Sequence, residues 1–204
     1  MGSAAAGDPS APRRRDADHT RAELLRVAKR RFTVFGYERT TTRDIAADAG
    51  VNISLIARYF GSKDGLYAAV LAESVGSFTP VAADGLVESL LAGLREGAWP
   101  EFGDVHPLLL LLRDAGDDDR TAELRRRTLR GVVAQLAGGL GAGDTAAGRT
   151  RAGVVLALFA GVVTLRAALP DESAGAADDA QLRAVLEDAI AGIVGGAAGP
   201  GEPR

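Results

Sequence analysis

The stretch TRDIAADAGVNISLIARYF, from Thr42 to Phe60, decides how the N-terminal part of this chain folds. Its apolar positions predict two short helices, and Gly50 between them supplies the positive φ that a tight turn needs. Ala46 is small enough to let the two helices cross closely. These are the proportions of a helix-turn-helix, although an ordinary hairpin of two helices would show the same spacing.

A longer helix is predicted before this stretch. Thr20 and Glu23 have the spacing of a capping box, which places the start of a first helix at Thr20. Gly36 would end that helix as a left-handed cap. Apolar residues then fall on one face at helical spacing: Leu24, Leu25, Ala28, Phe32 and Phe35.

Polar capping residues mark the next three helices. The threonines at 40–42 would cap a second helix over 43–49, and Asn52 would cap a third helix over 53–60. Ser62 would cap a fourth helix, which begins at Lys63 and runs to about Ser77. The outer face of the third helix would carry hydroxyl, guanidinium and small side chains suited to base edges and phosphates: Ser54, Leu55, Ala57, Arg58 and Tyr59.

The rest of the chain is predicted to be helical as well. Apolar periodicity indicates helices near 82–97, 104–115, 119–139, 146–169 and 178–194, and no segment has the pattern of a strand. The expected fold class is therefore all-α. The expected organisation, by residue numbers, is a disordered arm (1–18), a three-helix helix-turn-helix domain (19–66), a helical body (67–195) and a disordered tail (196–204).

Charge is distributed unevenly along the 204 residues, whose net charge is -3. Residues 13–63 hold twelve Lys and Arg against six Asp and Glu, a net charge of +6, whereas residues 64–204 hold twelve against twenty, a net charge of -8. A basic N-terminal third on an acidic body suggests that one end of the molecule meets a polyanion.

Several classes of function are disfavoured by composition. The chain has no Cys, which excludes disulfides, thiolate zinc sites and a cysteine nucleophile. Its two His residues lie far apart, and no nucleophile elbow, phosphate-binding Gly-Lys loop or zinc-protease signature is present. We therefore expect no enzyme activity, no cofactor and no metal.

The order of residues over about 18–66 resembles a known family. The chain has Thr20-Arg-Ala-Glu-Leu-Leu, then Phe32-x-x-x-Gly36-Tyr37-x-x-Thr40-Thr41-Thr42-Arg43-Asp44-Ile45-Ala46-x-x-Ala49-Gly50-Val51, and then Tyr59-Phe60-x-Ser62-Lys63-x-x-Leu66. This pattern resembles the N-terminal domain of the Tet-repressor family of bacterial transcription regulators. The resemblance implies a homodimer that binds a palindromic operator in double-stranded DNA, with one recognition helix per major groove, and a repressor that a small-molecule effector releases.

Position by position, the resemblance implies DNA contacts from residues in and beside the helix-turn-helix: Thr41, Thr42, Arg43, Asn52, Ile53, Ser54, Leu55, Ala57, Arg58, Tyr59 and Lys63. Ala57 stands where many members of the family have Tyr, and Leu55 replaces a frequent Thr. Fewer hydrogen-bond donors therefore remain, and we expect more weight on Arg43, Arg58 and Tyr59. Leu55 or Ala57 could contact thymine methyl groups. For Arg58, a solvated or purely phosphate-bound side chain is the alternative.

For the body, the resemblance implies dimerisation through the last two long helices and an enclosed pocket for an unknown effector. The segment Ala152–Leu169 is apolar on several faces, and it could pair with a final helix that carries Val185, Leu186, Ile190 and Ile193. A monomer core is the alternative. Large or polar-tipped residues are the pocket candidates, although plain core is the commoner role for them: Phe78, Trp99, Phe102, His106 and Phe159.

The expected location is cytoplasmic, associated with the nucleoid, with no membrane partner. The first residues lack the apolar core of a secretory signal. The longest uncharged run, Ala152–Leu165, spans roughly 21 Å, which is short of a hydrocarbon core of about 30 Å. Three rival functions stay open: a helical adaptor for another protein, a transcriptional activator on the same scaffold, and an enzyme.

Overall fold

The computed structural model describes residues 10–76, 83–95, 97–112, 119–141, 143–169 and 179–195. Within these ranges the regular elements are helices and no strand is present. They are α1 (Ser10–Phe35), α2 (Thr42–Asp48), α3 (Ser54–Phe60), α4 (Lys63–Gly76), α5 (Ala83–Gly93), the short 3-10 helix η1 (Pro100–Phe102), α6 (Pro107–Leu112), α7 (Asp119–Gly139), α8 (Ala146–Ala168) and α9 (Asp179–Gly195). The all-α prediction is confirmed.

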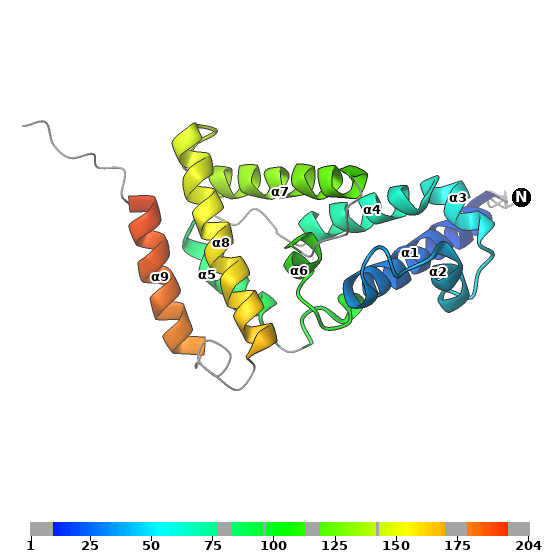
Figure 1. Ribbon diagram of the computed structural model, residues 1–204, viewed down its shortest axis with the longest axis horizontal. Helices are drawn as coiled ribbons and strands as arrows, with labels where there is room; N and C mark the ends of the chain where they lie inside the picture. Colours follow the sequence, from blue (N-terminus) through cyan, green and yellow to red (C-terminus); the bar gives the residue numbers. More distant parts are fainter. Residues whose placement is uncertain are drawn as a thin grey trace, which may run out of the picture.

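The molecule is elongated, with α1, α2 and α3 gathered at one end and α9 at the other (Figure 1). Helices α4 and α7 run along the long axis between the two ends. Helix α4 packs against α1 and α3 and also against α6 and α7. The expected domain boundary at residue 66 therefore lies inside a continuous helix, which joins the helix-turn-helix to the body.

The first helix starts earlier than the sequence predicts. It begins at Ser10, so residues 10–18 of the expected disordered arm are helical. The capping box at Thr20 does not form, because the Thr20 hydroxyl instead donates to the backbone carbonyl of Asp16 one turn earlier, at 2.7 Å. A threonine can cap only where the backbone amides are free, and inside a helix those amides are already bonded.

An aromatic cluster holds the N-terminal helices together. The ring of Phe32 in α1 lies 5.8 Å from that of Tyr37 and 5.1 Å from that of Tyr67 in α4, between ring centroids. Tyr37 and Tyr67 are 4.9 Å apart. All three are buried, and such pairs add stability beyond the area that they remove from water. This cluster fixes α4 against α1 and so sets where the helix-turn-helix sits.

The body is built around α8, which packs against α6, α7 and α9. Its buried face carries Ala152, Val155, Leu156, Phe159 and Val163. Among the described helices, α8 alone is long and apolar enough to cross a membrane by length and composition. The sequence argument considered only the uncharged run, but the helix continues past Arg151 and Arg166. A core helix of a water-exposed domain passes the same test, and α8 has three packed neighbours.

The predicted bounds of α7, α8 and α9 agree with the structure to within one residue. Helix α5 ends at Gly93 rather than near residue 97, and α6 begins at Pro107 rather than near residue 104. The predicted break at Trp99-Pro100 leads into η1, which packs against α1. The segment between α5 and α6 thereby becomes part of the contact between the body and the N-terminal domain.

Candidate DNA-binding surface and effector cavity

A capping box sets the start of α2. Thr41 has an extended backbone, and its side-chain oxygen accepts from the Asp44 backbone N–H at 3.1 Å while the Asp44 carboxylate accepts from the Thr41 backbone N–H at 3.0 Å. Hydrogen bonds from the Thr41 hydroxyl and backbone N–H lower the pKa of the Asp44 carboxyl from its usual value. Of the three predicted threonines, Thr41 is therefore the cap. Thr40 is buried, and its hydroxyl donates to the carbonyl of Gly36.

The turn between α2 and α3 has the predicted form. Gly50 adopts a φ of +64°, and the backbone N–H of Val51 closes the turn on the carbonyl of Ala46 at 3.0 Å. The Asn52 side chain accepts from the backbone N–H of Ser54 at 2.9 Å. Helix α3 therefore begins at Ser54, with Ile53 as its cap residue, one position later than expected.

The residues of α3 divide into an inner and an outer set. Ile56 is buried, as are Ile45 and Ala46 of α2, and all three belong to the same hydrophobic core. The exposed predicted contacts around α3 are Asn52, Ile53, Ser54, Ala57 and Arg58. Leu55 and Tyr59, four residues apart, are half-buried because they pack partly against the core. They are therefore the less accessible members of the predicted outer face.

At the start of α2, Thr41 and Arg43 are exposed and Thr42 is half-buried. Arg43 thus projects from the first turn of α2, and Arg58 from α3, where its guanidinium carbon lies 5.9 Å from the centroid of the Tyr59 ring. Two exposed guanidinium groups on neighbouring short helices form a positive surface that can face a phosphate backbone or base edges.

Lys63 is held by neighbours that sequence reasoning did not identify. Its ammonium lies 3.9 Å from the centroid of the Tyr37 ring, and the Tyr37 hydroxyl donates to the carboxylate of Asp64. A cation over an aromatic face is favourable, so Tyr37 fixes the direction of the Lys63 side chain at the start of α4. These contacts join residues 26 and 27 positions apart, and no local pattern in the sequence indicates them.

Arg31 is a second residue that sequence reasoning missed. Its guanidinium donates from Nε to the Asp48 carboxylate at 2.6 Å and lies 3.9 Å from that of Asp44. The hydrogen bond from Arg31 lowers the pKa of the Asp48 carboxyl. This contact ties the last part of α1 to α2, so a shift of α1 would be transmitted to the helix-turn-helix.

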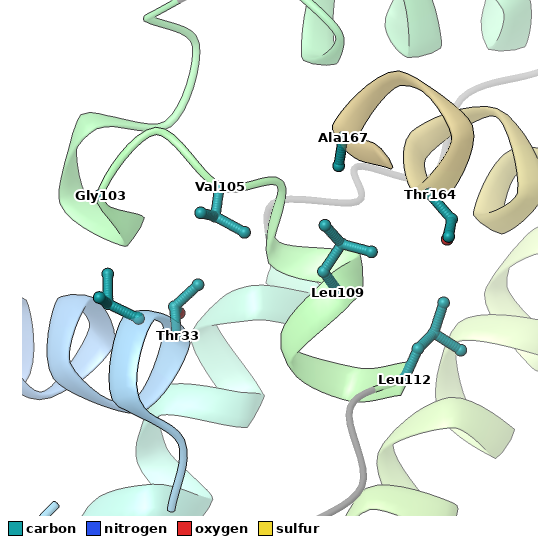
Figure 2. A pocket seen from close by; sticks show the side chains of 8 residues that line it. Thr33, Gly103, Val105, Leu109, Leu112, Thr164 and Ala167 are labelled. Carbon is teal, nitrogen blue, oxygen red and sulfur yellow. The ribbon is translucent and has the colours of Figure 1, made fainter. Parts of the chain in front are cut away.

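Two adjoining cavities lie where the N-terminal domain meets the body. One has a volume of about 670 Å³ and is lined from α1, α6, α8 and the loop after η1 by Thr33, Val34, Gly103, Val105, Leu109, Leu112, Thr164 and Ala167 (Figure 2). The other, of about 210 Å³, shares Val105, Leu109 and Ala167 with it. Both fall near or within the size range of small-molecule sites.

The predicted pocket residues are only partly at these cavities. Trp99 and His106 line the smaller one. Phe102 and Phe159 are buried and line neither of these two cavities. Phe78 lies outside the described residues. Thr33 and Val34 were missed because they belong to α1, which the sequence assigns to the DNA-binding domain.

His106 is a neutral group at physiological pH. Burial lowers its pKa to about 4. Its Nδ1 accepts from the backbone N–H of Leu108 at 3.1 Å, and its ring lies 5.2 Å from that of Trp99, between centroids. The Trp99 indole N–H in turn donates to the carbonyl of Gly93 at 2.6 Å. These contacts hold the rings of Trp99 and His106 in place, and the two rings form an aromatic wall of the smaller cavity.

The last two helices expose large apolar side chains. Val154 and Leu165 on α8 are 48% and 45% exposed, and Val185 on α9 is 65% exposed. Leu186 and Ile190, which the sequence placed at an intersubunit contact, are instead buried within this chain. Their helix packs on α5 and α8, so its inward face is used inside the subunit.

Models of one protein family match most of the chain. Residues 24–70 match the family described as bacterial regulatory proteins, tetR family, and residues 84–194 match the tetracyclin repressor-like C-terminal domain. The HTH-type transcriptional dual regulator CecR of Shigella flexneri is 44% identical over 52 residues, which are 26% of this chain. The match spans only 23% of that relative's length.

Solved structures share the fold over nearly their whole length. Salmonella enterica GusR superposes with a TM-score of 0.67 at 20% identity, covering 86% of this chain and 95% of that one. A SmeT–triclosan complex superposes with a TM-score of 0.63 at 18% identity, covering 91% of this chain and 100% of that one. The family and the named homologue are transcriptional regulators rather than enzymes.

Proposed function

This chain belongs to the tetR family of bacterial regulatory proteins, and we propose that it is a DNA-binding transcriptional regulator, a homodimeric repressor that a small molecule releases from a palindromic operator. The observation that carries the proposal is the pair of short helices α2 and α3, joined by the turn at Gly50. Ile45 and Ala46 of α2 and Ile56 of α3 are buried in the core, whereas Arg43 and Arg58 of the same helices are exposed.

The chemistry of this surface suits a major groove. Arg43 and Arg58 can each donate to guanine or to phosphate, and the Ser54 hydroxyl can serve either partner. Ile53, which is 46% exposed, offers an apolar contact for a thymine methyl group. Ala57 allows close approach, and Lys63 lies next to the N-terminus of α4, where anions are favoured. Tyr59 and Leu55 would contribute mainly by supporting the helix.

The exposed apolar residues of α8 and α9 support the dimer. Val154, Leu165 and Val185 would be covered in a two-fold contact between these helices, because removing such large apolar side chains from water favours association. On the opposite end of each subunit, α3 would then meet successive major grooves. Half-sites one helical turn apart require roughly 34–36 Å between the two recognition helices.

Release by an effector would act on that separation. Helix α4 contacts both the helix-turn-helix and the body, so a displacement at α6 or α7 moves α3 with it. A ligand that binds one arrangement better than the other shifts the population towards it. The SmeT–triclosan complex shows that a protein of this fold accepts a small molecule. We therefore expect an effector to weaken operator binding.

A selection from random double-stranded DNA, followed by binding titrations across a salt series, tests the proposal. Replacing Arg43 or Arg58 by Ala should weaken binding to the selected site by about 1–3 kcal/mol if the residue reads a base. Arg127→Ala is the matched control, since it removes the same exposed charge from α7 in the body. An adaptor would show weak binding with no sequence preference, and equal effects of the three variants.

Transcription in vitro from a promoter that carries the selected site separates repression from activation. A repressor lowers the transcript level as protein is added, because the dimer occludes the polymerase. An activator raises it, and that result would refute the repressor proposal while leaving the DNA-binding proposal intact.

A further inference from the structure

The larger cavity is unusual in its walls, because part of it is made by the DNA-binding domain itself. Thr33 and Val34 come from the last turn of α1, whereas the facing wall comes from Leu109 and Leu112 of α6 and from Thr164 and Ala167 of α8 (Figure 2). The side chains converge from three helices on one open space. Anything that occupies it touches both halves of the molecule at once.

The lining selects for a neutral occupant. Its described residues are five apolar side chains, one glycine and two threonines, and none of them is charged. Arg95, Asp104 and Arg166 line the smaller cavity instead, and Arg30, whose Nε would lie 4.0 Å from a Cβ on Gly103, is not among the lining residues of the larger one. The described lining offers an ion no charged partner, whereas an apolar molecule would gain from leaving water.

We propose that this cavity binds a neutral, largely apolar small molecule, and that the last turn of α1 senses its presence directly. The inference rests on the proposed function, for which it names the chemical class of the effector and the element that reads it. The exposed Thr164 of the lining offers a hydroxyl for a hydrogen bond to such a molecule.

The contacts around α1 explain how a molecule bound in the larger cavity would act on this helix. The loop after η1 lies very close to the helix, since a Cβ added to Gly103 would come within 3.0 Å of Val34 Cγ2 and 3.5 Å of Arg30 Cγ. Gly103 and Val34 both line the cavity, so a molecule seated beside Val34 touches the place where the loop and α1 approach each other closely. One turn before Val34, Arg31 holds Asp48 of α2 at 2.6 Å, so movement of this turn reaches the helix-turn-helix through one ion pair.

Binding of the neutral dye Nile red to the full chain without DNA tests the site. Ala167→Phe places a ring at a position that lines both cavities, whereas Ala168→Phe places the same ring on the next residue, which lines neither. Both positions are exposed on α8, so both variants should fold, and far-ultraviolet circular dichroism checks this. Nile red should bind Ala167→Phe roughly tenfold more weakly than either Ala168→Phe or the unmodified chain. Equal binding by the two variants would overturn the site.

Competition with three ten-carbon molecules tests the chemical class. Decanol, decanoate and decyltrimethylammonium have the same chain and differ in charge. Decanol should displace Nile red at the lowest concentration, because ionised head groups gain no partner in the larger cavity. Tighter binding of either ion would overturn the assignment of a neutral ligand.

Hydrogen exchange with and without Nile red tests the sensing step. The amides of residues 30–36 and 103–112 should exchange more slowly with the dye bound, while those of α9 should not change. Protection confined to the body would refute sensing by α1. These measurements use no DNA, so a negative result in them does not bear on DNA binding. Failure of the proposed function would instead appear as absent operator binding while the dye still binds.

Discussion

Replacing His106 by Asn should remove a pH dependence of stability that this one side chain confers. His106 is held neutral because burial lowers its pKa from 6.5 to about 4. In the unfolded chain the imidazole takes up a proton as the pH falls through 6.5, while in the folded chain it does so only near pH 4. The unfolded state then binds more protons, so folding stability is full above pH 6.5 and declines from there to pH 4.

The size of the effect follows from the two pKa values. At pH 5.0 the unfolded imidazole is 1.5 units below its own pKa, and each unit corresponds to about 1.36 kcal/mol, which predicts a loss of about 2 kcal/mol relative to pH 7.5. The carboxyls with lowered pKa values, such as Asp44 and Asp48, behave differently. Their contribution is lost only as the pH falls below their unfolded values near 4, so they do not mask the effect.

Urea unfolding followed by circular dichroism at pH 7.5 and pH 5.0, at one protein concentration, measures the difference. His106 Nδ1 accepts a hydrogen bond from the Leu108 backbone N–H. The side-chain oxygen of Asn at position 106 provides an acceptor in its place. The unmodified chain should lose about 2 kcal/mol more between the two pH values than the variant does. His19→Asn, at an exposed position of α1, is the control and should keep the full dependence. If the free energy of unfolding fell equally between the two pH values in the unmodified chain and in His106→Asn, the reasoning would be refuted.

Three further predictions concern the helix-turn-helix and the dimer. Thr41→Ala should lower the free energy of unfolding by about 1 kcal/mol in urea titrations, because the Asp44 amide loses its cap, whereas Thr41→Ser should be close to neutral. Gly50→Ala should cost about 1 kcal/mol in the same assay, because its φ of +64° is strained for a residue with a Cβ; an unchanged midpoint would contradict this. Val185→Asp should yield a folded monomer by sedimentation if α9 forms the dimer contact, since this side chain is 65% exposed within the subunit. An unchanged mass would argue against that interface.

Local signals in the sequence located most of the helices. The turn glycine at position 50 and the capping residues around α2 and α4 act within four positions of one another, so their effect can be anticipated without knowing the fold. The long apolar periodicities of α7, α8 and α9 were likewise sufficient. The capping pattern at Thr20 predicted a helix start that does not form. The helix continues through this residue, and the Thr20 hydroxyl bonds to a carbonyl of the preceding turn instead.

The sites depended much more on contacts between distant segments. Leu186 and Ile190 have the apolar character of an interface, but whether they meet α5 and α8 or a second subunit depends on how the helix is rotated. Phe102 and Phe159 look like pocket residues by type, yet they are packed in the core. Residue type indicates that a side chain leaves water, and only the packing decides what it meets.

The sequence by itself determined the all-α fold, the helix-turn-helix and its outward-facing cations, because each of these follows from spacing over a single turn or helix. The tertiary structure alone decided where the cavity lies and which residues hold the surface in place. Thr33 and Leu109 share a cavity although 76 positions separate them, and Tyr37 supports Lys63 across 26. Such juxtapositions arise from the packing of α1 against η1, α4 and α6, which minimises exposed apolar surface over the whole chain and leaves no local trace in the sequence.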